Sequence, residues 1–277
     1  MAGSDTAQQW IEQSAAEFEQ LIRGEGRSDE SILQDWLERH PAFVPLFDGP
    51  DRSGWPPWPG ALISQPRLTG IEGAVPDFCW LAANSAHLTA VMVEIEVPDK
   101  PWQHDQDLGQ AAPLTHARDQ INSWRSWFRD PANSVSFLND YLVPREYMDF
   151  EFRQHFLLIH GSRDEYIGDR SRTRQRAAGA SSPDETLMSF DRLSEIVDVR
   201  AARYGCVKRT GSGYVAVAVP PTWLPERLSS DALSRTTGYE EVIAASSVDD
   251  TTKSQWLTAL KTRSQPTGRR PRYRPRG

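Results

Sequence analysis

Residues 76–97 read PDFCWLAANSAHLTAVMVEIEV, and this stretch decides the fold. Two runs rich in β-branched, aromatic and aliphatic residues, 77–82 and 89–97, flank the turn-forming segment Asn-Ser-Ala. They predict two strands joined as a hairpin. With the turn centred between the runs, paired positions sum to about 171, which places Asp77 opposite Glu94 to within one or two residues.

Three carboxylates are therefore expected to lie close together at one end of this hairpin. Strand residues i and i+2 face the same side, so Glu94 and Glu96 project together beside Asp77. Like charges at such spacing repel, and Lys100 is the one basic residue nearby in sequence. A divalent cation is the simplest neutraliser, and carboxylate oxygens suit Mg²⁺ or Mn²⁺. From these residues alone there is an alternative to a metal site: Glu94 and Glu96 could lie on an ordinary half-exposed strand, and Asp77 could be a turn residue.

Periodic patterns on both sides of the hairpin predict a mixed α/β chain. Amphipathic or capped segments predict helices at 7–23, 30–40, 117–128 and 191–199, with a charged helix across 163–176. Further strands are expected at 155–160 and 187–190 and in a hairpin over 204–219, whereas 48–60, 98–114 and 177–183 have the composition of loops. The expected fold is a small mixed sheet flanked by helices.

Composition places the chain among cytoplasmic globular proteins. No apolar run approaches the length of a membrane span, and the N-terminus lacks the basic and apolar regions of a secretory signal. Two isolated cysteines, Cys79 and Cys206, cannot build a disulfide framework. P-loop, nucleophile-elbow and HExxH motifs are absent from the sequence, which argues against those chemistries.

Positive charge is concentrated at the C-terminus. The chain has a formal charge of −7, but residues 261–277 carry seven basic and no acidic residues, which leaves −14 on residues 1–260. This Pro/Arg-rich segment is expected to be disordered and able to follow a phosphate backbone, or else to be a solubilising tail. The arginines of 163–176 present the same choice between a phosphate-contacting face and a solvated helix.

Several short motifs give the chain a resemblance to a known family. They are ESILQDWLERHP (30–41), VPDF (75–78), VEIEVP (93–98), RDQINSW (118–124), LLIHGSR (157–163) and SFDRL (189–193). The Pro-Asp-x16-Glu-x-Glu spacing resembles the PD-(D/E)xK nuclease signature, and the six motifs in this order resemble the Shedu anti-phage nuclease domain. The resemblance covers about residues 15–200.

This resemblance implies a restriction-endonuclease-like fold and a metal-dependent DNA endonuclease of bacterial anti-phage defence. Carried over by position, Asp77, Glu94 and the carbonyl of Ile95 would bind Mg²⁺ or Mn²⁺, and Glu30 would approach the metal. Gln120 would orient substrate or water, although an ordinary exposed glutamine is the alternative. Relatives of this kind assemble as homo-oligomers, and a phage-derived trigger is implied.

The chain departs from the family pattern at one position. The lysine expected two residues after Glu94 is Glu96. A glutamate offers no positive charge, but it can act as a general base or hold a second cation. Lys100 or an arginine from elsewhere could supply the charge. Otherwise the site is degenerate, and the protein is a non-catalytic nucleic-acid-binding or regulatory module.

The predicted organisation has four parts. Residues 1–24 form an N-terminal helix, 25–203 the Shedu-like nuclease domain, 204–260 a C-terminal hairpin and helix, and 261–277 the basic tail.

Overall fold

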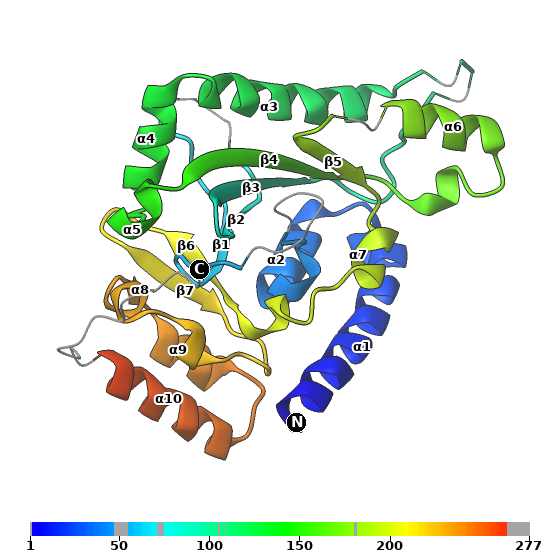
Figure 1. Cartoon of the computed structure of the whole chain (residues 1–277). Helices are drawn as coiled ribbons and strands as arrows, with labels where there is room; N and C mark the ends of the chain where they lie inside the picture. The colour runs from blue at the N-terminus through cyan, green and yellow to red at the C-terminus, as the bar shows by residue number, and fades with distance from the viewer. Residues whose placement is uncertain are drawn as a thin grey trace.

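The computed structural model describes residues 2–46, 55–70, 75–104, 106–107, 109–179 and 182–264. Within them the chain forms a single mixed sheet of eight strands, ordered β5-β4-β3-β2-β1-β6-β7-β8 (Figure 1). The strands are β1 (Ala61–Ser64), β2 (Phe78–Ala83), β3 (His87–Ile95), β4 (Glu151–Ile159), β5 (Glu185–Met188), β6 (Gly205–Arg209), β7 (Tyr214–Ala218) and β8 (Thr236–Thr237). The predicted α/β class is confirmed, and the architecture is consistent with a restriction-endonuclease-like fold.

Helices cover both faces of the sheet (Figure 1). One face packs against α1 (Ala2–Arg23), α2 (Glu30–Arg39) and α7 (Asp191–Glu195). The other packs against α3 (Ala112–Phe128) and α4 (Pro131–Asp140), with α5 (Arg145–Met148) following α4. A third apolar cluster lies beside β7 and includes residues of α8 (Ser230–Ser234), α9 (Tyr239–Ala245) and α10 (Asp250–Ser264). The charged helix α6 (Arg170–Gly179) lies near the β5 edge.

The central hairpin alternates its side chains between the two apolar clusters. Val91 and Val93 of β3 enter the cluster beneath α1 and α2, whereas Ala90 and Met92 enter the cluster beneath α3. Both sides of β3 are therefore buried, and β4 pairs with it in parallel along its whole length. This arrangement fixes the register of β3, because a one-residue slip would exchange its two faces.

The boundaries of α2 follow from its sequence. The side chain of Asp29 accepts hydrogen bonds from the N–H groups of Ser31 and Ile32, which satisfies two donors of the first turn. Pro41 follows the C-cap His40, and its missing N–H ends the helix. Helix α2 therefore begins at Glu30, which lies at the end of the sheet where β1 and β3 end.

Some expectations need correction. The strand β1 was not predicted, because it is only four residues long and lies beside a Pro/Trp-rich segment. Residues 163–176 form a 3₁₀ turn, Arg163–Glu165, followed by α6, and α6 continues to Gly179 within the predicted loop. Helix α10 runs to Ser264, so the first four residues of the predicted tail are helical. The rest of that tail, 265–277, and most of the predicted loop 48–60 lie outside the described residues.

In the part of the chain that the structure describes, no helix is both long enough and apolar enough to cross a membrane. The two cysteines are buried free thiols on central strands. Burial raises the pKa of each thiol, which keeps both in the neutral form.

Candidate active site

The predicted hairpin register is confirmed. Phe78 pairs with Val93, and the preceding Asp77 donates its N–H to the Val93 carbonyl at 3.0 Å. The N–H of Ile95 in turn donates to Asp77 Oδ2 at 2.7 Å. The carboxylate of Asp77 is therefore held against the end of β3, beside Glu94.

Asp77 and Glu94 both have pKa values raised above their ordinary range. Burial raises the pKa of Asp77 to about 7, and burial together with the facing Asp77 raises the pKa of Glu94 well above its usual range. Glu94 is only 6% exposed, and its Oε2 is buried without a hydrogen-bond partner among the described residues. Burial and the facing like charge therefore both disfavour the doubly ionised state of this pair, and a bound cation would favour it.

Two further carboxylates lie within electrostatic range of this pair. Glu96 is 4% exposed, and its charge contributes to the raised pKa of both Asp77 and Glu94. Glu30 lies at the start of α2, on the solvent side, where partial burial and the nearby Glu96 raise its pKa. The structure thus brings Asp77, Glu94, Glu96 and Glu30 to one end of the sheet.

Lys100 reaches back to Glu96. Its Nζ forms an ion pair with Glu96 Oε2, and its charge also acts on Glu30. The Lys100 side chain is 36% exposed and that of Glu96 only 5%. A positive charge is therefore present at the site, although it comes from four residues further along the chain.

Gln120 lies half-buried on α3, and its side chain forms no hydrogen bond with another described residue, while Trp124, one turn later, is fully buried in the core. The expected Gln-x-x-x-aromatic pair is therefore present on the helix, with the aromatic residue packing the sheet. Its predicted role toward substrate stays a prediction.

Sequence reasoning missed a polar stripe on α2. Gln34 donates to Ser64 Oγ at 3.1 Å and to the carbonyl of Asp77 at 3.5 Å. Glu38, one turn further, accepts from Ser64 Oγ at 2.5 Å and pairs with Lys208 Nζ at 3.0 Å. The signal was the spacing of Glu30, Gln34 and Glu38, since polar residues four apart share one helix face.

A comparison with models of known protein families matches residues 27–194 to the family described as "Shedu protein SduA, C-terminal". The chain belongs to this Shedu family. The comparison with curated proteins found no match. Membership of the Shedu family indicates a role in anti-phage defence.

The residues of the Shedu site suit a hard divalent cation by their chemistry. All the candidate ligands are oxygens, and the orphaned Glu94 Oε2 is a buried acceptor that lacks a donor among the described residues. The N–H of Ile95 faces Asp77, so its carbonyl, on the same edge of the strand, does too. In the present side-chain positions, however, the described residues contain no group of three Asp, Glu, His or Cys side chains arranged to hold an ion. A third carboxylate would have to turn inward.

The charged helix α6 is not a simple solvated face. The guanidinium of Arg176 stacks over the rings of Trp102 and Tyr166, at 4.1 and 4.4 Å from their centres. Arg172 pairs with Glu165, whose carboxylate also accepts the N–H of Trp102 at 2.7 Å. Two of the five arginines therefore pack against the segment that follows Lys100, which helps to fix the position of that lysine.

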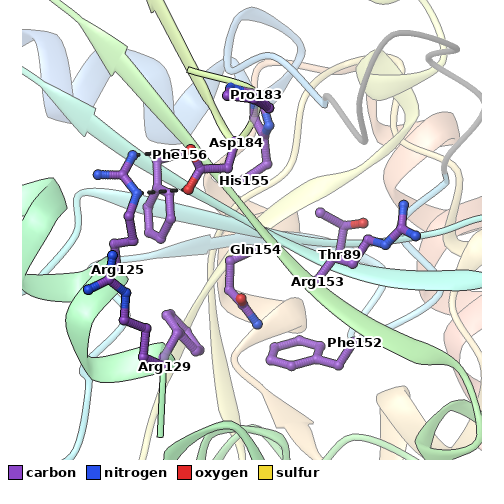
Figure 2. Close-up of a pocket in the computed structure, with 11 residues that line it drawn as sticks. Thr89, Arg125, Arg129, Phe152, Arg153, Gln154, His155, Phe156, Pro183 and Asp184 are labelled. Atoms are coloured by element: carbon purple, nitrogen blue, oxygen red, sulfur yellow. Dashed lines mark hydrogen bonds and ion pairs between the residues drawn. The ribbon is translucent and has the colours of Figure 1, made fainter. Parts of the chain in front are cut away.

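A cavity of about 460 Å³ lies away from this site, at the edge of β4 (Figure 2). Arg129, Phe152 and Gln154 line one side of it, and Thr89 and Arg153 line the other. None of the four carboxylates lines this cavity, although its Phe156 pairs with Met92, two residues before Glu94. This cavity is therefore separate from the carboxylates.

Proposed function

We propose that this Shedu protein is a metal-dependent DNA endonuclease of anti-phage defence with a PD-(D/E)xK-type site. The observation that carries the proposal is the group of four carboxylates at one end of the sheet, with a buried Glu94 Oε2 that has no partner among the described residues. Proteins rarely desolvate acidic groups this far without a function for them. Mg²⁺ or Mn²⁺ is the cofactor that such oxygen ligands suit.

Asp77, Glu94 and the Ile95 carbonyl would hold the ion, with Glu30 as the carboxylate that turns inward. A bound divalent ion would polarise the scissile phosphate and lower the pKa of a water. Glu96 is the base that accepts a proton from the attacking water, since it is buried beside the pair and held by Lys100. Lys100 supplies the positive charge that stabilises the developing phosphate charge. Gln120 positions the substrate.

A second candidate is a non-catalytic nucleic-acid-binding or regulatory module. It is favoured by the ion pair of Glu96 and Lys100, because each of these charges already has a partner in the structure. Under this alternative the carboxylates would bind an ion without cleavage.

Nicking of supercoiled plasmid by the purified full chain, with Mg²⁺ or with EDTA, separates the two. We expect cleavage with Mg²⁺ only, and its loss in Asp77→Asn and Glu94→Gln at unchanged circular dichroism. Glu146→Gln is the matched control, because Glu146 is exposed on α5. Cleavage by both site variants at the rate of the control would contradict the assignment, and ion binding without cleavage would favour the second candidate.

The remaining proposals follow the family resemblance. DNA is the partner, the protein assembles as a homo-oligomer, and a phage-derived trigger activates it. The division into an N-terminal helix, a nuclease domain at 25–203 and a C-terminal unit stays a prediction. Gel filtration with light scattering tests the assembly.

A further inference from the structure

A cavity lined by charged, polar and apolar residues lies beside Asp77, at the ends of β1 and β6. Its volume is about 700 Å³, larger than that of the cavity in Figure 2. The lining residues that matter are Ser64, Gln65, Arg67, Lys208, Arg209 and Thr210. The last three belong to the C-terminal hairpin or its turn, which lies beyond the part of the chain matched by the Shedu family.

The sheet fixes the distance between this cavity and Asp77. Ser64 pairs with Phe78 on one side and with Lys208 on the other. Gln65, the next residue, donates its N–H to the Asp77 carbonyl at 2.7 Å. Lys208 and Arg209 therefore lie two strand spacings from the β2 end, which is about 10 Å.

The cavity carries positive charge that the described residues do not neutralise. The guanidinium of Arg209 donates to the carbonyls of Asp140 and Gly213, at 2.5 and 2.7 Å, and so keeps its full charge. Arg67 is exposed, and its side chain forms no ion pair with another described residue. The carboxylate of Asp140, which also lines the cavity, accepts a hydrogen bond from Thr69 and keeps its negative charge, so Arg67 and Arg209 together exceed it by one positive charge.

Lys208 is held in place by a buried network. Its ammonium pairs with Glu38, which is 7% exposed, while the Lys208 side chain remains 39% exposed at the cavity. Ser64 and Gln34 join the same network and connect it to the Asp77 carbonyl. The fixed ammonium of Lys208 thus shares the cavity with Arg67, whose charge is available to a ligand. The overall charge of the chain is negative.

We propose that this cavity binds the sugar–phosphate backbone of duplex DNA on one side of the phosphate held at the carboxylates. The inference deepens the proposed nuclease function and rests on it. A separation of about 10 Å equals about three base pairs of rise along the axis of a duplex, at 3.4 Å each. The hydroxyl of Thr210 and the exposed Gln65 add neutral donors of the kind that contact phosphates.

The cavity of Figure 2 is the weaker place for a polyanion. Its Arg125 is paired with Asp184 and Glu185, and its Arg153 is paired with Glu151. Of its three arginines, Arg129 alone forms no ion pair with a described residue. The variant Arg129→Ala therefore tests whether the duplex binds at the cavity of Figure 2.

The test is fluorescence anisotropy of a labelled random-sequence duplex with the full chain in EDTA, across a salt series. Binding is measured without cleavage, so it does not depend on nuclease activity. For Arg67→Ala we expect weaker binding and a log–log salt slope smaller by about 0.9, because one phosphate would no longer be neutralised. Arg67→Lys should keep the slope. Arg23→Ala, on the exposed end of α1, is the charge-matched control and should match the wild type.

Each outcome decides the inference. A smaller slope in Arg67→Ala, with Arg129→Ala and the control unchanged, supports it even if the plasmid assay shows no cleavage. A slope change in Arg129→Ala alone would overturn it, and so would superimposable slopes for all variants. Tight binding of single-stranded RNA with no binding of the duplex would also overturn it, while a loss of cleavage alone would not.

Discussion

Replacing Asp77 by asparagine should stabilise the metal-free protein at alkaline pH. The side-chain oxygen of the asparagine would still accept the N–H of Ile95, which donates to Asp77 Oδ2 at 2.7 Å, so the local geometry has a substitute acceptor. What the substitution removes is a desolvated carboxylate that faces Glu94.

The magnitude follows from proton linkage. The pKa of Asp77 rises from 3.8 to about 7 in the folded protein, so the unfolded chain releases this proton at lower pH than the folded one does. Stability therefore falls as pH rises from about 4 to about 7, by at most about 4 kcal/mol at 1.36 kcal/mol per pH unit. Because Asp77 remains partly open to solvent and titrates jointly with Glu94, we expect about 1–3 kcal/mol at pH 8.

Thermal unfolding in EDTA at pH 5 and pH 8 measures this effect. We expect the Tm of Asp77→Asn to exceed that of the wild type by roughly 3–8 °C at pH 8, and by less at pH 5. Asp119→Asn, at an exposed position on α3, is the matched control and should leave Tm unchanged at both values. An asparagine variant that is less stable at pH 8, or equally shifted at both pH values, would refute the reasoning.

Three other predictions rest on separate contacts. Lys100→Met should lower the rate of plasmid nicking at least about tenfold without unfolding the protein, because the ion pair with Glu96 holds the cation at the site. Lys100→Arg should recover part of that rate. Equal nicking rates for the wild type and both variants would show that Lys100 has no part in the mechanism. Gly161→Ala should destabilise the protein by about 2–4 kcal/mol in urea unfolding, since Gly161 has φ +64° and an added Cβ would overlap the Trp102 indole and lie 2.8 Å from the Lys100 carbonyl. Deleting residues 265–277, beyond the end of α10, should reduce the log–log salt slope of duplex binding by about 0.9 for each phosphate that the segment neutralises, and an unchanged slope would make that segment irrelevant to binding.

The part of the site that could be predicted from sequence is the part built by local pairing. Asp77 directly precedes β2 and Glu94 lies on β3, and these strands are joined by a three-residue turn, so the turn and the apolar alternation together set the register. The Asp29 cap of α2 is equally local. Neither required knowledge of residues far away in the chain.

The part that could not be predicted depends on long-range pairing. Strand β1 pairs in parallel with β6, which brings Ser64 beside Lys208. No periodicity in either segment encodes that partner, and a four-residue strand beside a Pro/Trp-rich segment has little pattern of its own. The contact of Glu38 with Lys208, and the cavity that Ser64 and Lys208 line, depend on this pairing.

The prediction of a disordered tail was wrong at its start for a related reason. Helix α10 has few apolar residues, so it lacks the amphipathic pattern that identifies a helix in sequence. It is held instead by Trp256, which packs with Trp223, and by Arg263, which donates to the Leu228 carbonyl at 2.7 Å. Both contacts are tertiary.

Glu96 and Lys100 show why a charged residue has to be judged by its position in space as well as in sequence. A residue two positions after Glu94 lies on the same side of the strand as Glu94. In this chain Glu96 occupies that place, and Lys100 brings an ammonium to it from the loop after β3. The segment just beyond Lys100 is fixed in turn by Glu165, which accepts the N–H groups of Trp102 and Gln103, and by Arg176 stacked over Trp102. The position of the positive charge beside Glu96 therefore depends on contacts with residues about sixty to eighty positions further along the chain, and no local motif encodes it.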